Sequence, residues 1–216
     1  LFNRGMLDAG THPTRLAWFV EATGEALREY IWVDAASGGI LLNFSQLPTA
    51  KNRTVYDANL QSALPGTLVR SEGQGPSAIN DVNQAYDFAG ATYDYFFNTH
   101  GRDSYDGFGA ELRSTVRYRE NPGQPYQNAF WDGVRRQMVY GEGWAAADDV
   151  VAHELTHAVV ENSADFFSYY QSGALSESYA DIFGQAVDLT RGTVDDAGNL
   201  RWRVAEDSPV GAIRDM

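Results

Sequence analysis

Residues 149–184 read DVVAHELTHAVVENSADFFSYYQSGALSESYADIFG, and this stretch decides which fold and which chemistry we expect. His153 and His157 are four residues apart. An α-helix has about 3.6 residues per turn, so such a pair lies on one face and its imidazoles can share one metal ion. Glu154 is rotated by about 100° from His153. Its carboxylate should therefore sit beside the metal and face a bound water, as expected of a general base.

A catalytic zinc site uses three protein ligands and keeps one position open for water, so the two histidines need a further partner. Glu177, in the segment SESYAD, is the natural third ligand. Asp181 follows one turn later on the same predicted helix and can accept a hydrogen bond from the outer ring nitrogen of a ligating histidine. The chain contains no cysteine, so every metal ligand has to be a histidine or a carboxylate.

The pentapeptide HELTH alone is only moderately specific, because an exposed helix can carry such residues as ordinary solvated polar groups. Two observations weaken that interpretation. Glu177 and Asp181 fall on a second predicted helix, and the first helix has apolar residues that mark its buried faces: Val150, Val151, Leu155 and Ala158. Metal-assisted hydrolysis of a peptide bond is therefore the leading hypothesis.

Composition limits the other classes of function. The 216 residues are 44% apolar, which supports a sizeable core in one large or two small domains. Acidic residues outnumber basic residues 29 to 16 and give a formal charge of −13, which argues against nucleic acid as a partner. No apolar run approaches the length of a membrane-spanning helix, and the N-terminus lacks a signal-peptide pattern. We expect no membrane partner.

The predicted elements are strands followed by long helices. Aromatic and β-branched residues favour strands at residues 15–21, 27–34 and 40–44, which form a small antiparallel meander, and further strands within 112–140. Apolar residues recur every three or four positions over residues 77–99, which predicts a long buried helix, and helices follow at roughly 148–162 and 173–190. Without βαβ alternation, this order favours an α+β class with an antiparallel or mixed sheet.

With the metal residues identified, the chain resembles the thermolysin-like zinc endopeptidases, also called gluzincins. In that family HExxH is followed by a glutamate ligand twenty residues after the second histidine, as Glu177 follows His157 here. The segments TVYDA, ALPG, YDYFFNTHGRDSYDG, NAFWDG and QMVYGEG resemble family segments in family order, so the likeness covers roughly residues 54–216. It implies a secreted metalloendopeptidase with Zn²⁺ as cofactor, in which zinc-activated water attacks a peptide or protein substrate and Glu154 is the general base.

The resemblance also implies residues that bind the substrate. Asn128 and Ala129, in NAFW, match an edge strand that pairs with the peptide. Arg214, in the closing IRDM, matches an arginine that binds a substrate carbonyl. The family places a tyrosine between its two zinc helices to stabilise the oxyanion; counting from the second histidine gives Ser168 at that position, so the neighbouring Tyr169 is our candidate.

Calcium is a further cofactor that the resemblance suggests. Asp149, Asp188 and Glu206 match three carboxylates that bind calcium in the family, and such oxygens suit a hard cation. Arg201 and Arg203 occupy positions that are often acidic, so we expect at most one calcium ion where relatives hold a pair. A surface without calcium is the alternative.

Two domains follow from the resemblance. Residues 1–50 resemble the end of the family's pro-region and form an antiparallel β segment, as in a zymogen. Residues 51–216 resemble the N-terminal catalytic domain. Because the pro-like meander runs almost directly into TVYDA, we expect it to stay attached and to complete the sheet of the catalytic domain.

The family also has a helical C-terminal domain that closes the cleft, and Met216 precedes any such domain. We therefore expect this domain of the same protein as a partner, and weak or no proteolysis by the present chain alone. Three interpretations remain open. The chain is a fragment of an active endopeptidase, a self-sufficient reduced enzyme, or a non-catalytic zinc-stabilised binding or pro-like module.

Overall fold

The computed structural model describes residues 13–24, 27–45, 51–121, 123–164, 166, 169–191 and 201–216. The chain divides into two compact units, Leu1–Pro48 and Thr49–Met216. The expected boundary at residue 50 falls among residues 46–50, which lie outside the described part.

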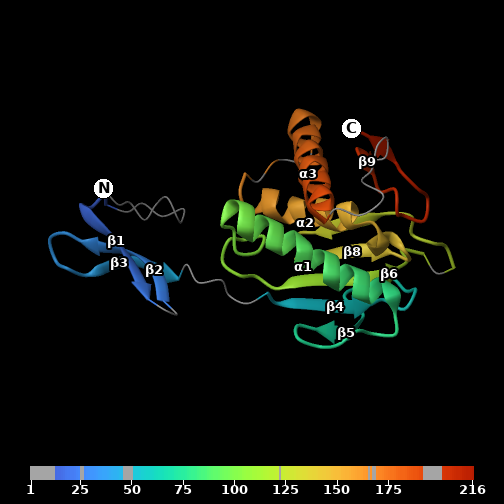
Figure 1. Cartoon of the computed structure of the whole chain (residues 1–216), viewed down its shortest axis with the longest axis horizontal. Coiled ribbons are helices and arrows are strands. Elements are labelled where there is room, and N and C mark those ends of the chain that lie inside the picture. The colour runs from blue at the N-terminus through green and yellow to red at the C-terminus, as the bar shows by residue number, and fades with distance from the viewer. Residues whose placement is uncertain are drawn as a thin grey trace. The chain divides into compact units, whose positions relative to one another are not determined.

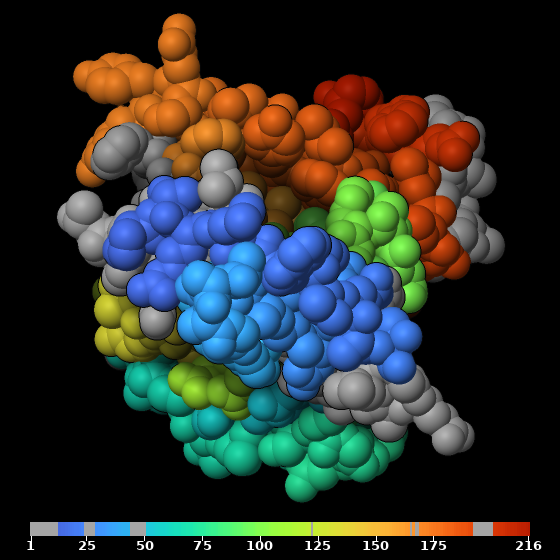
Figure 2. All heavy atoms as spheres, turned by 90° about the vertical axis from the view of Figure 1, so that its left-hand side faces the viewer, coloured from blue at the N-terminus to red at the C-terminus, as the bar shows by residue number. Residues whose placement is uncertain are grey.

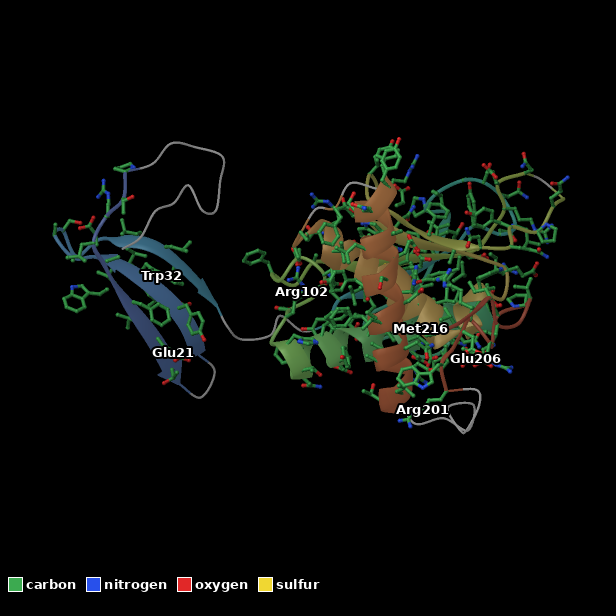
Figure 3. All side chains as sticks on the ribbon, turned by 90° about the horizontal axis from the view of Figure 1, so that it is seen from above. Glu21, Trp32, Arg102, Arg201, Glu206 and Met216 are labelled. Atoms are coloured by element: carbon green, nitrogen blue, oxygen red, sulfur yellow. The ribbon has the colours of Figure 1, made fainter. Side chains whose placement is uncertain are left out.

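The first unit is a three-stranded antiparallel meander. It consists of β1 (Ala17–Gly24), β2 (Leu27–Asp34) and β3 (Ile40–Ser45), in the order β1-β2-β3 (Figure 1). Phe19 lies opposite Trp32 in the register, and the two rings are 5.0 Å apart (Trp32 is labelled in Figure 3). Asp34 ends β2 and accepts hydrogen bonds from the backbone N–H groups of Ala36 and Ser37, which fixes the turn into β3. The predicted meander is confirmed.

The expectation that this meander completes the sheet of the catalytic domain stays a prediction. Among the described strands, β1, β2 and β3 pair only with one another, and the second unit has a separate sheet. Figure 2 looks onto this unit, drawn in blue, whose exposed side chains include Trp18 and Phe19.

The second unit contains a five-stranded mixed sheet in the order β5-β4-β6-β8-β7. The strands are β4 (Arg53–Asp57), β5 (Thr67–Ser71), β6 (Leu112–Tyr118), β7 (Ala129–Asp132) and β8 (Gln137–Gly141). The β4–β6 and β6–β8 pairs are parallel, whereas the two outer pairs are antiparallel. Among the described strands, β7 is therefore an edge strand that pairs with β8 on one side only.

The sequence pattern does not predict β4 or β5. Each has five residues with charged or hydroxyl side chains among the apolar ones, so their periodicity is weak. Long-range contacts stabilise them instead. Arg53 in β4 forms an ion pair with Glu72 just after β5, and Asp57 in β4 forms one with Arg117 in β6.

The described part of the second unit also contains three α-helices. They are α1 (Asn80–His100), α2 (Asp148–Glu161) and α3 (Tyr170–Arg191), and the 3-10 turn η2 (Trp144–Ala146) precedes α2. The predicted helices are confirmed, with ends shifted by a few residues. Two aspartates in the first turn of α2 suit the positive end of its dipole. α1 and α2 pack against the sheet, and α3 packs on α2 (Figure 1).

The core of the second unit lies between the sheet and the first two helices. Side chains that are at most 2% exposed include Val55, Val82, Leu112, Val116, Met138, Tyr140, Val151 and Leu155. Strands and helices together confirm the α+β class. Among the described residues, no helix combines the length and the apolar character needed to cross a membrane.

A short hairpin of β9 (Arg203–Val204) and β10 (Arg214–Asp215) ends the chain. Hydrogen bonds attach it to the helices, and two of them lie at or next to β9. The N–H of Ala205 donates to the Asp149 carboxylate at 2.6 Å, and the Gln185 side-chain amide donates to the Arg203 carbonyl at 2.9 Å. The hairpin is thereby fixed to the start of α2 and to α3, which brings Arg214 to the site described next.

Candidate metal centre

Three donor atoms from α2 and α3 converge on one point. Nε2 of His153 lies 3.0 Å from Nε2 of His157. The Glu177 carboxylate places one oxygen 3.5 Å from the first of these nitrogens and the other oxygen 3.4 Å from the second. With zinc–ligand bonds of about 2.1 Å, the ligand atoms of a tetrahedral site are about 3.4 Å apart. The donor set and its spacing therefore fit a zinc ion.

The outer ring nitrogens of both histidines face oxygen atoms. Nδ1 of His153 lies 2.9 Å from the Asp181 carboxylate, as expected from the sequence. Nδ1 of His157 lies 3.3 Å from the hydroxyl of Ser176. An oxygen acceptor at Nδ1 favours the tautomer that leaves Nε2 free to bind a metal. Asp181 also accepts a hydrogen bond from Arg214 at 2.6 Å, which holds that guanidinium at the site.

Burial and neighbouring charge shift the pKa values here. Burial raises the pKa of Glu154 to about 7, with a further rise from the Glu177 charge and an opposing effect from His153. Burial lowers the pKa of His153, but Asp181 and Glu177 outweigh it and raise the value to about 9. Burial and the charge of His153 lower the pKa of His157 to about 4. Carboxylates that favour an imidazolium also favour a bound cation, so a metal ion would displace the proton on His153.

α2 and α3 approach each other closely at Gly184, and this approach sets the spacing of the ligands. A Cβ atom at Gly184 would lie 2.9 Å from the Asp149 carbonyl oxygen and 3.6 Å from Cβ of His153. The nearer contact is with helix backbone, which cannot turn aside as a side chain can. A larger residue would push α3, and Glu177 with it, away from the histidines.

We expect Gly184→Ala to weaken zinc binding by about tenfold, within the range seen when the support of a metal ligand is disturbed. A competition titration with a chromophoric chelator would measure the affinity. Ser178→Ala is the matched control, because Ser178 is exposed on the same helix. Unchanged zinc affinity in a folded Gly184→Ala protein would contradict this account of the helix contact.

The ligands open onto a cavity of about 680 Å³. Asn128 and Ala129 at the start of β7, Glu154 on α2 and Arg214 on β10 all line it, so the structure brings these sequence candidates together with the metal ligands. Tyr169 is not among the lining residues and is 73% exposed. Its role at an oxyanion stays a prediction, and Ser168 lies outside the described residues.

Several lining residues are not identified by the sequence pattern. Trp131, Glu161 and Phe166 line the cavity, and Ser176 lies both on its wall and against His157. Trp131 could have been identified as a lining residue from the sequence, because it belongs to the segment NAFWDG, three residues after Asn128. The others depend on which faces of α2 and α3 meet, which the motif spacing alone does not specify.

The three carboxylates proposed for calcium are placed differently. Among the described residues, the group that brings three ligand atoms within 4.8 Å of one another is that of the two histidines and Glu177, so Asp149, Asp188 and Glu206 form no such group. Asp149 accepts hydrogen bonds from Ala205 and Gln185 instead, and burial raises its pKa to about 6. Glu206 follows β9 (labelled in Figure 3). Calcium binding stays a prediction.

Known proteins are similar to this chain in sequence and in fold. A family model described as the catalytic domain of thermolysin metallopeptidases matches residues 42–161. An extracellular metalloprotease from Pectobacterium carotovorum subsp. carotovorum is 47% identical over 150 residues, which are 66% of this chain and 42% of that protein. A bacillolysin from Brevibacillus brevis is 39% identical over 220 residues, which are 90% of this chain and 38% of that protein.

Among solved structures, the precursor of protealysin, a metalloproteinase from Serratia proteamaculans, matches with a TM-score of 0.63 and 38% identity. The match covers 72% of this chain and 48% of that one. The chain thus spans about two fifths of the length of the two curated relatives, which are covered to 42% and 38%.

Proposed function

Because this chain belongs to the thermolysin metallopeptidase family, we propose that it forms the zinc-binding part of a metalloendopeptidase that hydrolyses peptide bonds. The observation that carries the proposal is the convergence of three donor atoms, from His153, His157 and Glu177, beside a buried carboxylate on an open cavity. In the proposal these three residues hold the ion. When bound, zinc supplies a Lewis acid that polarises a carbonyl group and lowers the pKa of water.

Glu154 is the proposed general base. Its carboxylate takes a proton from the attacking water and passes it to the nitrogen of the leaving amine, so that it ends the cycle as it began. A pKa of about 7, raised chiefly by burial, suits both transfers near neutral pH. Glu154 directly follows His153 in the sequence. Its carboxylate lines the cavity but does not belong to the group of three metal ligands.

The substrate is proposed to bind along β7. An edge strand offers unpaired N–H and C=O groups to an extended peptide, and Asn128 and Ala129 stand where β7 meets the metal centre. Arg214, which donates a hydrogen bond to Asp181, would contribute the remainder of its guanidinium N–H groups to a substrate carbonyl. Asp181 thereby orients both His153 and Arg214.

A C-terminal domain of the same protein is proposed to complete the cleft. Two observations support it. The curated relatives extend well beyond the matched region. In addition, α3 carries an apolar stripe of Leu175, Tyr179 and Ile182 at four- and three-residue spacing, and each of these side chains is over 40% exposed. Such a stripe is normally covered.

We expect the complete gene product to contain a helical region after Met216 and to cleave peptides about a hundredfold faster than residues 1–216, because donors to the transition state have effects of that order. The comparison requires kcat/KM for both proteins on one peptide. A stop codon directly after residue 216, or equal rates, would contradict the proposed incompleteness.

Hydrolysis itself is tested with zinc-loaded protein, a mixture of peptides and mass spectrometry of the products. We expect cleavage at internal bonds that is lost on adding a chelator. If neither this chain nor the complete gene product cleaved any peptide while zinc still raised the melting temperature, the alternative of a non-catalytic zinc-stabilised binding or pro-like module would replace the proposal.

We further infer a pro-like segment at residues 1–50 and a catalytic domain at residues 51–216, in a protein that acts outside the cell. The separate compactness of Leu1–Pro48 supports the division, and a relative named as an extracellular metalloprotease supports the location. N-terminal sequencing of the protein recovered from culture medium would test both. A start near residue 51 supports a cleaved pro-segment, and absence from the medium contradicts secretion.

A further inference from the structure

A carboxylate outside the metal centre lines the same cavity. Glu161 is the last residue of α2, two turns after Glu154. The indole N–H of Trp131, on β7, donates a hydrogen bond to Oε2 of Glu161. A Cβ atom at Gly133 would lie 2.6 Å from that same oxygen, so the carboxylate rests against the turn that follows β7. Two elements therefore fix its position at the far end of the edge strand.

Among the described residues, Glu161 has no cationic partner within ion-pair distance. Its partner Trp131 is neutral. One indole N–H is one hydrogen bond, whereas the two oxygens of a carboxylate can accept several. Nearby, the cavity wall includes the apolar side chains of Val160 and Phe166. A carboxylate beside apolar surface suits the aliphatic stem and cationic head of a lysine or arginine.

The cavity also contains an arginine, which is already paired with a carboxylate. Arg214 lines the cavity and pairs with Asp181, which faces His153 in the first half of α2. Glu161 lies eight residues later on that helix, or about 12 Å along its axis. A peptide in the cavity would therefore meet the carboxylate of Glu161 well away from the Arg214–Asp181 ion pair.

Distances along the two elements locate Glu161 relative to the reacting bond. From Glu154 to Glu161 the helix rises about 10 Å, and an extended peptide advances about 3.3 Å per residue. The backbone of Trp131 lies beside Glu154, and its side chain reaches Glu161. A peptide paired with β7 would thus pass Glu161 about three residues from the bond at the metal centre.

We propose that Glu161 is a specificity-determining residue that selects peptides with a lysine or arginine about three residues from the cleaved bond. The inference rests on the proposed function, because that function makes the ligand of the cavity a peptide. Glu161 takes no part in the chemistry; it acts on the side chain of the substrate.

Equilibrium binding tests the selection separately from catalysis. A labelled neutral ten-residue peptide would carry a single lysine, glutamine or glutamate at each position in turn, and fluorescence anisotropy would measure its affinity for zinc-loaded Glu154→Gln protein. We expect lysine at one or two positions to bind about threefold to fivefold more tightly than glutamine, as for an exposed ion pair. The ratio should fall as salt is added.

Adding Glu161→Gln should abolish this preference, and Glu161→Lys should reverse it in favour of glutamate. Glutamine keeps the acceptor for the Trp131 indole, so the melting temperature should stay unchanged. Glu120→Gln is the matched control, because Glu120 is exposed and does not line the cavity. The inference would be overturned if the affinity did not depend on the charge of the peptide. It would also be overturned if the Glu161→Gln protein still bound the lysine peptides more tightly.

The two proposals fail in different ways. Charge-selective binding without any cleavage by wild-type protein would leave the role of Glu161 standing and remove the proposed hydrolysis. Cleavage by a protein that binds peptides independently of their charge would leave the proposed hydrolysis standing and remove the role of Glu161.

Discussion

Replacing Glu154 by glutamine should lower kcat/KM for peptide hydrolysis by about a thousandfold, the order expected when a general base is lost. The side chain is 7% exposed and lines the cavity beside the metal ligands. Glutamine fills the same space and cannot accept a proton from water. The loss should therefore appear in kcat, with zinc content unchanged because Glu154 lies outside the group of donor atoms.

Kinetics on one quenched fluorescent peptide, together with metal analysis of the same preparation, would measure both quantities. Glu120→Gln is again a suitable control, since it removes an exposed carboxylate outside the cavity. A Glu154→Gln protein that retained wild-type activity would exclude this residue as the base. One that lost zinc would show that its carboxylate supports the metal instead.

Removing zinc should lower the melting temperature of the second unit by about 10 °C. A ligand present at a thousand times its Kd stabilises the folded state by about 4 kcal/mol, and each kcal/mol shifts the melting temperature of a domain of this size by about 2–4 °C. The stabilisation arises because the ion joins α2 to α3 through His153, His157 and Glu177. Differential scanning fluorimetry with and without a strong chelator would measure the shift.

His157→Ala should abolish the difference that the chelator makes, because two protein ligands remain where three are needed. His100→Ala is the matched control. His100 lies at the end of α1 against Phe96 and Phe183, so its loss should lower the melting temperature directly while the chelator still causes a further drop. A chelator effect that persists in His157→Ala would place the metal elsewhere.

The metal centre could be predicted from sequence because its geometry is local. His153, Glu154 and His157 lie within two turns of one helix, and Glu177 and Asp181 lie on the next. Helical periodicity alone then fixes which of them share a face. The same argument fails for Tyr169, whose position depends on the conformation of the segment between the two helices rather than on periodicity.

Features that depend on distant pairing could not be predicted. β4 joins the sheet through β6, from which it is separated by more than fifty residues, and its own five residues carry little pattern. The sequence resemblance suggests Asp149 as a calcium ligand. It does not predict that the N–H of Ala205, in the hairpin, donates a hydrogen bond to the Asp149 carboxylate. No sequence motif identifies Glu161, because its place in the cavity follows from its contact with Trp131.

The attachment of the C-terminal hairpin to Asp149 has a consequence for the order of folding. The metal ligands are 24 residues apart at most, so the chain closes only a short loop when α2 meets α3. The contact between Ala205 and Asp149 closes a loop of 56 residues and orders a longer segment. We therefore expect the metal site to form before Arg214 reaches Asp181, so that a nascent chain binds its ion before Arg214 joins the cavity wall.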